Sequence, residues 1–248
     1  MKIVVIIPAR YQSSRFEGKA LALIAGKPMV QWVYERSVQA VRVDDVAVAT
    51  DDQRIVDVVK KFGGKAIMTS DENRSGTDRV AEAAAIMELA PDDIIINVQG
   101  DQPLLDPRSL DQVVSPFFTE SNIEMSTLGF PIENEREITD PKDIKVVFDQ
   151  KGFALYFSRS TIPFCRDPGI EFDTYKHLGI YAYTRRFLEV YRSLPVGRLE
   201  EIEKLEQLRA IEYGHPIRVV VTPYDSPEVD LPVDIERIEK KMKQMEID

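Results

Sequence analysis

Residues 1–30, MKIVVIIPARYQSSRFEGKALALIAGKPMV, decide the fold, because an apolar strand runs directly into a basic loop. The run from Lys2 to Ala9 predicts a central parallel strand that is covered on both faces. The loop after it combines cations, hydroxyls and a glycine: Arg10, Ser13, Ser14, Arg15, Gly18 and Lys19. These groups suit phosphate oxygens, although the spacing is neither that of a Walker loop nor that of a dinucleotide fingerprint. We interpret the loop as a binding site for a nucleotide triphosphate, and the alternative is a solvated surface loop.

The rest of the first half alternates strands with helices. Strand-length apolar runs occupy 45–50, 65–70 and 93–101, and helical patterns occupy 28–41, 51–64 and 78–90. This order predicts an α/β fold with a Rossmann-like, doubly wound and mainly parallel sheet.

The second half changes character. Residues 124–132 and 144–160 have the patterns of antiparallel strands, and the latter predicts a hairpin that turns at 149–152. A strand at 177–184, helices at 185–194 and 198–214, a strand at 216–224 and a terminal helix at 231–247 follow. No linker separates the halves. We therefore expect a single domain over 1–248, with a smaller antiparallel extension at about 121–185.

The chain as a whole is acidic, with a net charge of −10 over 248 residues. Such a field repels polyanions, so we expect neither nucleic acid nor a membrane surface as a partner, and any anion site must be local. Cys165 is the single cysteine, which excludes an internal disulfide and indicates a reducing compartment. The first apolar run is too short for a signal peptide, and none reaches the roughly 20 apolar residues of a membrane span. We expect a cytoplasmic protein.

Two further motifs fall where parallel strands end, which is where open α/β sheets bind ligands. Residues 75–79, SGTDR, precede a helix, and this motif either caps the helix or recognises a base or sugar. Residues 99–103, QGDQP, follow the fourth strand and deliver Asp101 to the mouth of the sheet. A carboxylate there, opposite a triphosphate loop, is suited to Mg²⁺. Asp230, just before the last helix, is either a second metal ligand or a helix N-cap.

Several segments together resemble the 3-deoxy-manno-octulosonate cytidylyltransferases, or CMP-Kdo synthetases, across the whole chain: IPARYQSSRFEGKALALIAGKPM, SGTDR, NVQGDQP, ALYFSRSTIPF, KHLGIYAY, IEKLEQLR and VDLP. The resemblance implies a nucleotidyltransferase-type fold and a transferase that joins CTP to the acidic eight-carbon sugar Kdo, with Mg²⁺ as cofactor. The products are CMP-Kdo and pyrophosphate, and the pathway is lipopolysaccharide biosynthesis.

The resemblance also implies roles for particular residues. Arg10, Arg15, Lys19 and Asp101 match the catalytic positions. The positions that bind CTP match Arg10, Ser13, Arg15, Lys19, Ser75, Gly76, Arg79 and Gln99. The metal ligands match Asp101 and Asp230, and the sugar pocket matches Arg159, His177, Tyr181, Glu206 and Gln207. Since the sugar carries a carboxylate, Arg159 and His177 are the expected cations of this pocket.

Two departures from the commoner pattern concern the sugar. FEGKAL stands where LPGKPL is usual, and QGDQP stands where QGDEP is usual. They resemble the branch that uses the 8-amino analogue of Kdo. We predict Kdo as the substrate. The rivals are its 8-amino analogue, another acidic sugar, and a non-catalytic nucleotide-binding scaffold. No residue is identified as a general base. The apolar 144–160 segment and the resemblance also predict a homodimer.

Overall fold

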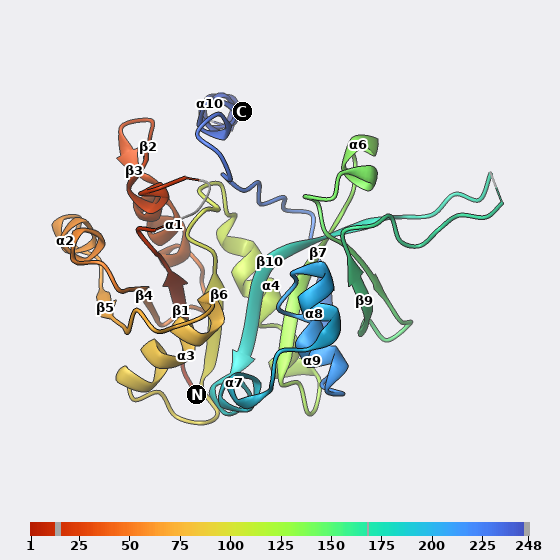
Figure 1. Ribbon diagram of the computed structural model, residues 1–248, viewed down its shortest axis with the longest axis horizontal. Coiled ribbons are helices and arrows are strands. Elements are labelled where there is room, and N and C mark those ends of the chain that lie inside the picture. The colour runs from red at the N-terminus through yellow and green to blue at the C-terminus, as the bar shows by residue number, and fades with distance from the viewer. Residues whose placement is uncertain (13–15, 168, 246–248) are drawn as a thin grey trace.

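The computed structural model describes residues 1–12, 16–167 and 169–245. Within these ranges, strands from both halves of the chain join one nine-stranded sheet, with a separate two-stranded ribbon. The strands are β1 (Ile3–Pro8), β2 (Leu23–Ile24), β3 (Lys27–Pro28), β4 (Asp45–Thr50), β5 (Ala66–Met68), β6 (Ile94–Val98), β7 (Met125–Pro131), β8 (Lys145–Phe148), β9 (Ala154–Ser158), β10 (Tyr175–Thr184) and β11 (Arg218–Val221). The predicted mixed α/β fold with a mainly parallel sheet is confirmed (Figure 1).

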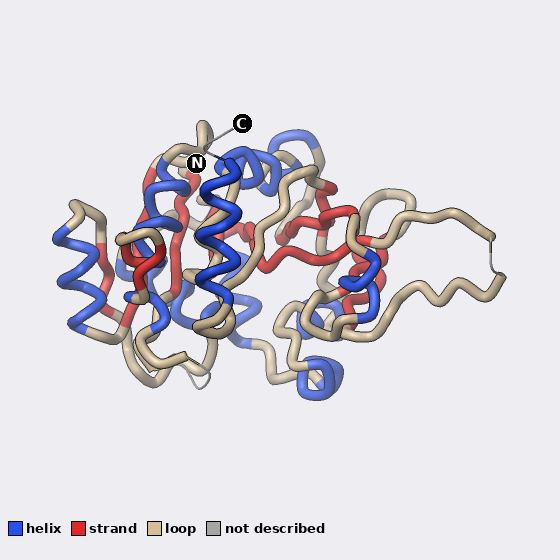
Figure 2. The backbone as a smooth tube through the Cα atoms, turned by 90° about the horizontal axis from the view of Figure 1, so that it is seen from above, coloured by secondary structure: helices blue, strands red, loops and turns tan. Residues whose placement is uncertain are grey.

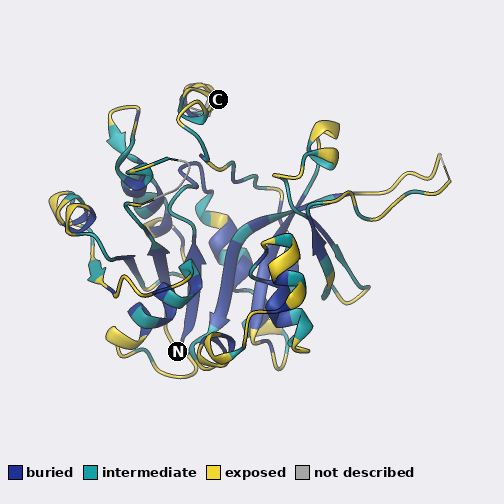
Figure 3. Cartoon of the chain, viewed as in Figure 1, coloured by how far each residue is buried: buried dark blue, intermediate teal, exposed yellow. Residues whose placement is uncertain are grey.

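Helices cover both faces of this sheet. They are α1 (Met29–Val38), α2 (Gln53–Lys61), α3 (Gly76–Ile86), α4 (Pro107–Val113), α5 (Pro116–Thr119), α6 (Glu135–Thr139), α7 (Arg185–Ser193), α8 (Arg198–Glu203), α9 (Leu208–Glu212) and α10 (Asp234–Met245), with a short 3-10 turn η1 (Lys19–Leu21). One core contains residues of α1, α2 and α4, and the other contains residues of α3, α7 and α9. Figure 3 shows the sheet as the buried centre between these layers.

The first strand explains how the two cores are divided. Ile3, Val5 and Ile7 belong to one core, whereas Val4 and Ile6 belong to the other. Successive side chains of a strand point to opposite faces, so an uninterrupted apolar run requires helices on both sides. The sequence prediction for this stretch is therefore confirmed.

Strand order brings the two halves together. The row runs β11-β7-β10-β6-β1-β4-β5. Among the described strands of this row, β10 alone runs antiparallel to its neighbours, since β6 and β7 both pair with it in that sense and β11 pairs with β7 in parallel. The carboxyl ends of the other strands therefore meet at one edge. The first residues of β10 extend past that edge, because its pairing with β6 begins only at Ile180.

The hairpin of β8 and β9 confirms the predicted turn at 149–152, where the amide of Gly152 donates to the carbonyl of Asp149 at 2.9 Å. Beyond β9, residues 160–167 and 169–174 belong to an extended arm that projects from the body (Figures 1 and 2). Phe164 is 84% exposed, and Ile170 and Phe172 are also exposed on this arm.

The prediction of one helix over 198–214 is wrong. The structure has α8 and α9 instead, with Lys204 in the left-handed conformation at φ 54°. The interruption is held from outside the helix, because the Tyr191 hydroxyl donates to the carbonyl of Glu206 at 2.6 Å. Tertiary contacts thus override the continuous helical pattern. The break directs Glu206 and Gln207 toward the interior instead of along a helix face.

Candidate active site

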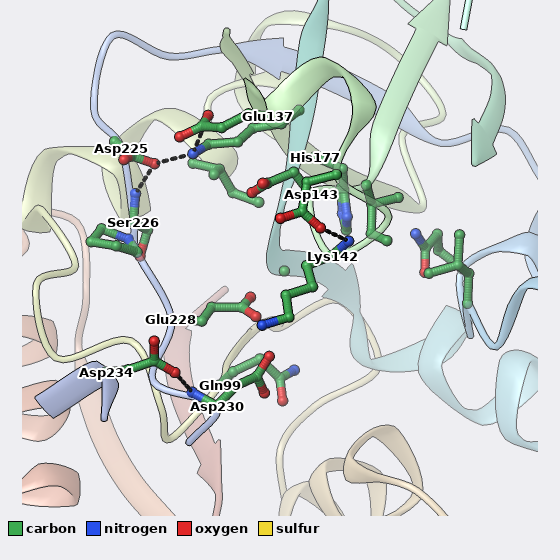
Figure 4. Close-up of a pocket in the computed structure, with 18 of the residues that line it drawn as sticks. Gln99, Glu137, Lys142, Asp143, His177, Asp225, Ser226, Glu228, Asp230 and Asp234 are labelled. Atoms are coloured by element: carbon green, nitrogen blue, oxygen red, sulfur yellow. Dashed lines mark hydrogen bonds and ion pairs between the residues drawn. The ribbon is translucent and has the colours of Figure 1, made fainter. Parts of the chain in front are cut away.

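A cavity of about 530 Å³ opens at the edge where the strand carboxyl ends meet. Its walls come from the start of α3, the end of β6, the loop between α6 and β8, the start of β10, the break between α8 and α9, and the segment after β11. Figure 4 shows side chains from these segments converging on the cavity. Segments far apart in sequence therefore contribute to one chamber.

Lys19, Asp101 and Asp230 form a charged cluster beside this cavity. Lys19 Nζ lies 2.6 Å from Asp101 Oδ2 and 3.8 Å from Asp230 Oδ1. The loops that carry the two acids are joined, because the amide of Val229 donates to the carbonyl of Asp101 at 3.0 Å. Asp230 is not the N-cap of the last helix, because α10 begins only at Asp234. Asp234 accepts from the amides of Asp230 and Leu231, each at 2.9 Å.

The two acids fit a magnesium ion held jointly with a substrate. Asp101 Oδ1 is buried and has no hydrogen-bond partner among the described residues. Within the described ranges, no group of three or more His, Cys, Asp or Glu side chains could hold a metal ion. Mg²⁺ is commonly bound by one or two carboxylates together with substrate phosphates, so the pair suffices when a triphosphate supplies the other oxygens.

Glu228 is an acidic residue of this cluster that the sequence analysis missed. It lines the cavity and is exposed to solvent there. The surrounding protein, and then the charges of Asp101 and Asp230, raise the pKa of Glu228 to about 7. Gln102 Nε2 donates to its Oε1 at 3.3 Å. No local pattern indicates this position, because it depends on the segment after β11 running along the sheet edge to Asp101, where the amide of Val229 donates to the Asp101 carbonyl.

The basic loop is described only in part. Arg10 donates from Nη2 to the carbonyl of Asn73 at 2.6 Å, which ties the loop to the segment before α3. Lys19 belongs to the charged cluster. The predicted ligands Ser13 and Arg15 lie outside the described residues. Arg10 and Lys19 thus lie on the sheet edge expected for a triphosphate.

The SGTDR motif has both structural and cavity-lining members. Ser75 caps α3 by accepting from the amide of Asp78 at 3.1 Å. Gly76 lines the cavity with Gln99, and a Cβ on Gly76 would stand 3.4 Å from Pro8. Arg79 is fully buried and donates to Thr69 and Asp51 at 2.6 Å each. Arg79 therefore braces the loops after β4 and β5 instead of lining the cavity.

Four of the five predicted sugar residues line the cavity. The Thr77 hydroxyl donates to Glu206 Oε2 at 2.8 Å, and the Tyr181 hydroxyl donates to Gln207 Oε1 at 3.0 Å. Burial raises the pKa of Glu206. Gln207 Nε2 is buried without a hydrogen-bond partner among the described residues, so this amide remains available as a donor.

His177 is held in one neutral tautomer. The Thr127 hydroxyl donates to the carbonyl of Ile180 at 2.8 Å, so its oxygen accepts from His177 Nε2 at 2.9 Å. Burial lowers the pKa of His177 to about 3. The side chain can therefore serve as a hydrogen-bonding group, but it is uncharged at neutral pH.

Arg159 is not among the cavity-lining residues. Its Nε donates to the carbonyl of Glu203 at 2.7 Å, and its Nη1 donates to the carbonyl of Pro141 at 2.9 Å. The guanidinium therefore joins the end of α8 to the loop before β8. Neither Arg159 nor His177 thus provides the cationic contact that the sequence analysis expected.

The family follows from a match over most of the chain. Residues 4–219 match the model of the cytidylyltransferase family. The chain belongs to this family. A 3-deoxy-manno-octulosonate cytidylyltransferase of Desulfatibacillum aliphaticivorans is 65% identical over 243 residues, which cover 98% of this chain and 99% of the relative. An 8-amino-3,8-dideoxy-manno-octulosonate cytidylyltransferase of Shewanella amazonensis is 55% identical over 244 residues, with 98% and 99% covered.

A solved structure supports the same assignment. This cytidylyltransferase is similar to a CMP:2-keto-3-deoxy-manno-octonic acid synthetase complexed with CTP, with a TM-score of 0.92 and 42% sequence identity. The similarity covers 99% of this chain and 100% of the solved one. In the part of the chain that the structure describes, no helix combines the length and the apolar character needed to span a membrane.

We predict that the state of His177 is measurable as a pH dependence of stability. The native pKa lies below the ordinary value of about 6.5, so between these values the unfolded chain binds a proton that the native chain does not. Stability conferred by the neutral ring is therefore complete above pH 6.5 and declines as the pH falls. We would measure the free energy of unfolding of wild type and His177→Gln by denaturant from pH 7.5 to 4.5. The stability of wild type relative to His177→Gln should decrease as the pH falls. A difference that stays constant with pH would contradict the assignment.

Proposed function

We propose that this cytidylyltransferase joins CTP to 3-deoxy-manno-octulosonate, giving CMP-Kdo and pyrophosphate for lipopolysaccharide biosynthesis. The observation that carries the proposal is the position of Lys19, Asp101 and Asp230 beside a cavity lined by Tyr181, Glu206 and Gln207. Phosphate chemistry and sugar binding would thus meet at one edge of the sheet. The 65% identity to a relative named for Kdo supports the choice of sugar.

The proposed reaction is an in-line displacement at the α-phosphorus of CTP. The anomeric 2-hydroxyl oxygen of the sugar forms the new bond to phosphorus, the bond between the α-phosphorus and the bridging oxygen breaks, and pyrophosphate leaves. Arg10 and Lys19, with Arg15 in the same loop, would bind the triphosphate and offset its charge. Asp101 and Asp230 would hold Mg²⁺, which supplies positive charge to the phosphate oxygens.

We also propose that the nucleoside lies near the start of α3. Gly76 and Gln99 line the same cavity, and Gln99 offers a side-chain amide there. Ser75 and Arg79 would act mainly by fixing this segment, since one caps α3 and the other is buried under it. This division refines the set of nucleotide-binding residues expected from the resemblance.

The test of the function is pyrophosphate release with CTP, Mg²⁺ and a panel of acidic sugars. We expect turnover with Kdo and a higher kcat/KM for Kdo than for its 8-amino analogue. A preference of about tenfold for the amine, equal to 1.4 kcal/mol, would reassign the substrate. CTP binding without turnover of any acidic sugar would support the non-catalytic scaffold.

A second prediction concerns Asp101. Asp101→Asn keeps the shape of the side chain but removes the charge that attracts Mg²⁺, so turnover should fall by about a hundredfold or more. The melting temperature should change little. Asp57→Asn, on the exposed side of α2, is the matched control and should keep wild-type rates. Near-normal turnover of Asp101→Asn at ordinary Mg²⁺ concentrations would refute the assignment.

We further propose that the chain acts as a homodimer in the cytoplasm, as a single nucleotidyltransferase domain with an antiparallel portion at about 121–185. The exposed apolar side chains Leu155, Phe164, Ile170 and Phe172 lie on β9 and the arm, where a second copy would cover them.

Sedimentation tests the proposed dimer directly. We expect a dimer at micromolar concentration, and we expect Phe164→Ser combined with Ile170→Ser to shift it toward monomer. A wild-type monomer at that concentration would refute the proposal.

A further inference from the structure

The proposed sugar raises an electrostatic problem at the reacting end of the cavity. Its carboxylate is bonded to the same carbon as the hydroxyl that attacks phosphorus. That carboxylate must therefore lie near Asp101, Asp230 and Glu228, which are all acidic side chains at this end of the cavity. Like charges at such distances disfavour binding unless a cation lies between them. Mg²⁺ held by Asp101 and Asp230 would offset their charge together with that of the triphosphate, so a side-chain cation near Glu228 would favour binding of the sugar carboxylate.

Several cations in or near the cavity already have partners. Lys19 pairs with Asp101, and Arg159 is bound to backbone carbonyls outside the cavity. Lys176 Nζ lies 3.0 Å from both Glu137 and Asp225. Arg237 donates to the carbonyl of Glu228 at 2.9 Å and lies 3.4 Å from Asp234. These side chains would have to give up existing partners to bind a carboxylate.

Lys142 differs from them. It lines the cavity from the loop between α6 and β8, and Figure 4 shows its side chain extending toward Glu228. Within the described ranges, the Lys142 ammonium makes no hydrogen bond or ion pair. Lys142 is thus a cation near the reacting end whose ammonium group has no hydrogen-bond or ion-pair partner among the described residues.

The loop that carries Lys142 is anchored on both sides. Lys145 Nζ donates to the carbonyl of Asp140 at 2.7 Å and to the carbonyl of Asp143 at 2.6 Å. Arg159 holds the carbonyl of Pro141, and the amide of Lys142 donates to Asp140 Oδ1 at 2.9 Å. The backbone beneath Lys142 is therefore fixed while the side chain itself remains adjustable. A fixed backbone with an adjustable side chain suits a residue that binds a ligand.

We propose that Lys142 binds the carboxylate of the acidic sugar and makes the cavity specific for sugars that carry this group. The inference rests on the proposed function and deepens it. Lys142 places positive charge between the substrate carboxylate and Glu228. This role accounts for an acidic cavity accepting an acidic sugar. Arg159 then acts as a positioning residue, since it holds the Lys142 loop.

The experiment compares wild type with Lys142→Gln, using Kdo and the analogue in which the carboxylate is a neutral carboxamide. In wild type, kcat/KM should be higher for the acid than for the amide. Lys142→Gln should raise KM for Kdo by about tenfold or more, since a charge-assisted contact is lost. The preference for acid over amide should shrink by a similar factor. KM for CTP should stay within about twofold, and Lys142→Arg should recover part of the loss.

Lys151→Gln, in the exposed β8–β9 turn, is the matched control because it removes the same charge away from the cavity. It should leave both sugars unaffected, and melting temperatures of all variants should agree. Equal KM values and an unchanged preference for acid over amide in Lys142→Gln would overturn the inference while leaving the proposed function intact. Failure of the wild type to turn over any acidic sugar would instead overturn the proposed function, and this inference with it.

Discussion

The ion pair between Lys19 and Asp101 is the contact on which the site depends. It joins the loop after β1 to the loop after β6, at 2.6 Å, in the centre of the sheet edge. The same lysine reaches toward Asp230, and the backbone of Val229 binds that of Asp101, so the segment after β11 is drawn to the same point. Three distant parts of the chain thus meet at one cluster of charge. Such clusters persist only where opposite charges and ligands offset the repulsion among the acids.

The reversed strand β10 and the break between α8 and α9 complete the chamber. Because β10 runs against β6, its first residues project beyond the edge where β6 ends, and they bring His177 over the cavity. The break delivers Glu206 and Gln207 to the facing wall, where Thr77 and Tyr181 bind them. Both features interrupt regular structure. A continuous helix or an additional parallel strand would not present these side chains to the same space.

Sequence patterns predicted elements well where local physics dominates. The apolar run of β1, the helix from Met29 and the β8–β9 hairpin all appear as expected, because burial periodicity and turn chemistry are local properties. The helix over 198–214 was wrong because Tyr191, on the preceding helix α7, donates to the backbone carbonyl of Glu206. Glu228 and Lys142 were missed for a related reason. No pattern around either residue indicates that its loop faces a cavity.

The sequence by itself determined the doubly wound sheet and the sheet edge at which the loops carrying Lys19, Asp101 and Asp230 meet. It could do so because strand alternation dictates where loops meet, and the resemblance assigned chemistry to those loops. Only the tertiary structure decided which side chains are available to a ligand. Arg79 pairs with Asp51, and Arg159 donates to the backbone carbonyl of Glu203, so both guanidiniums already have partners. The His177 ring is neutral. Burial and hydrogen-bond partners govern charge and access, and both depend on contacts between segments that the linear sequence keeps apart.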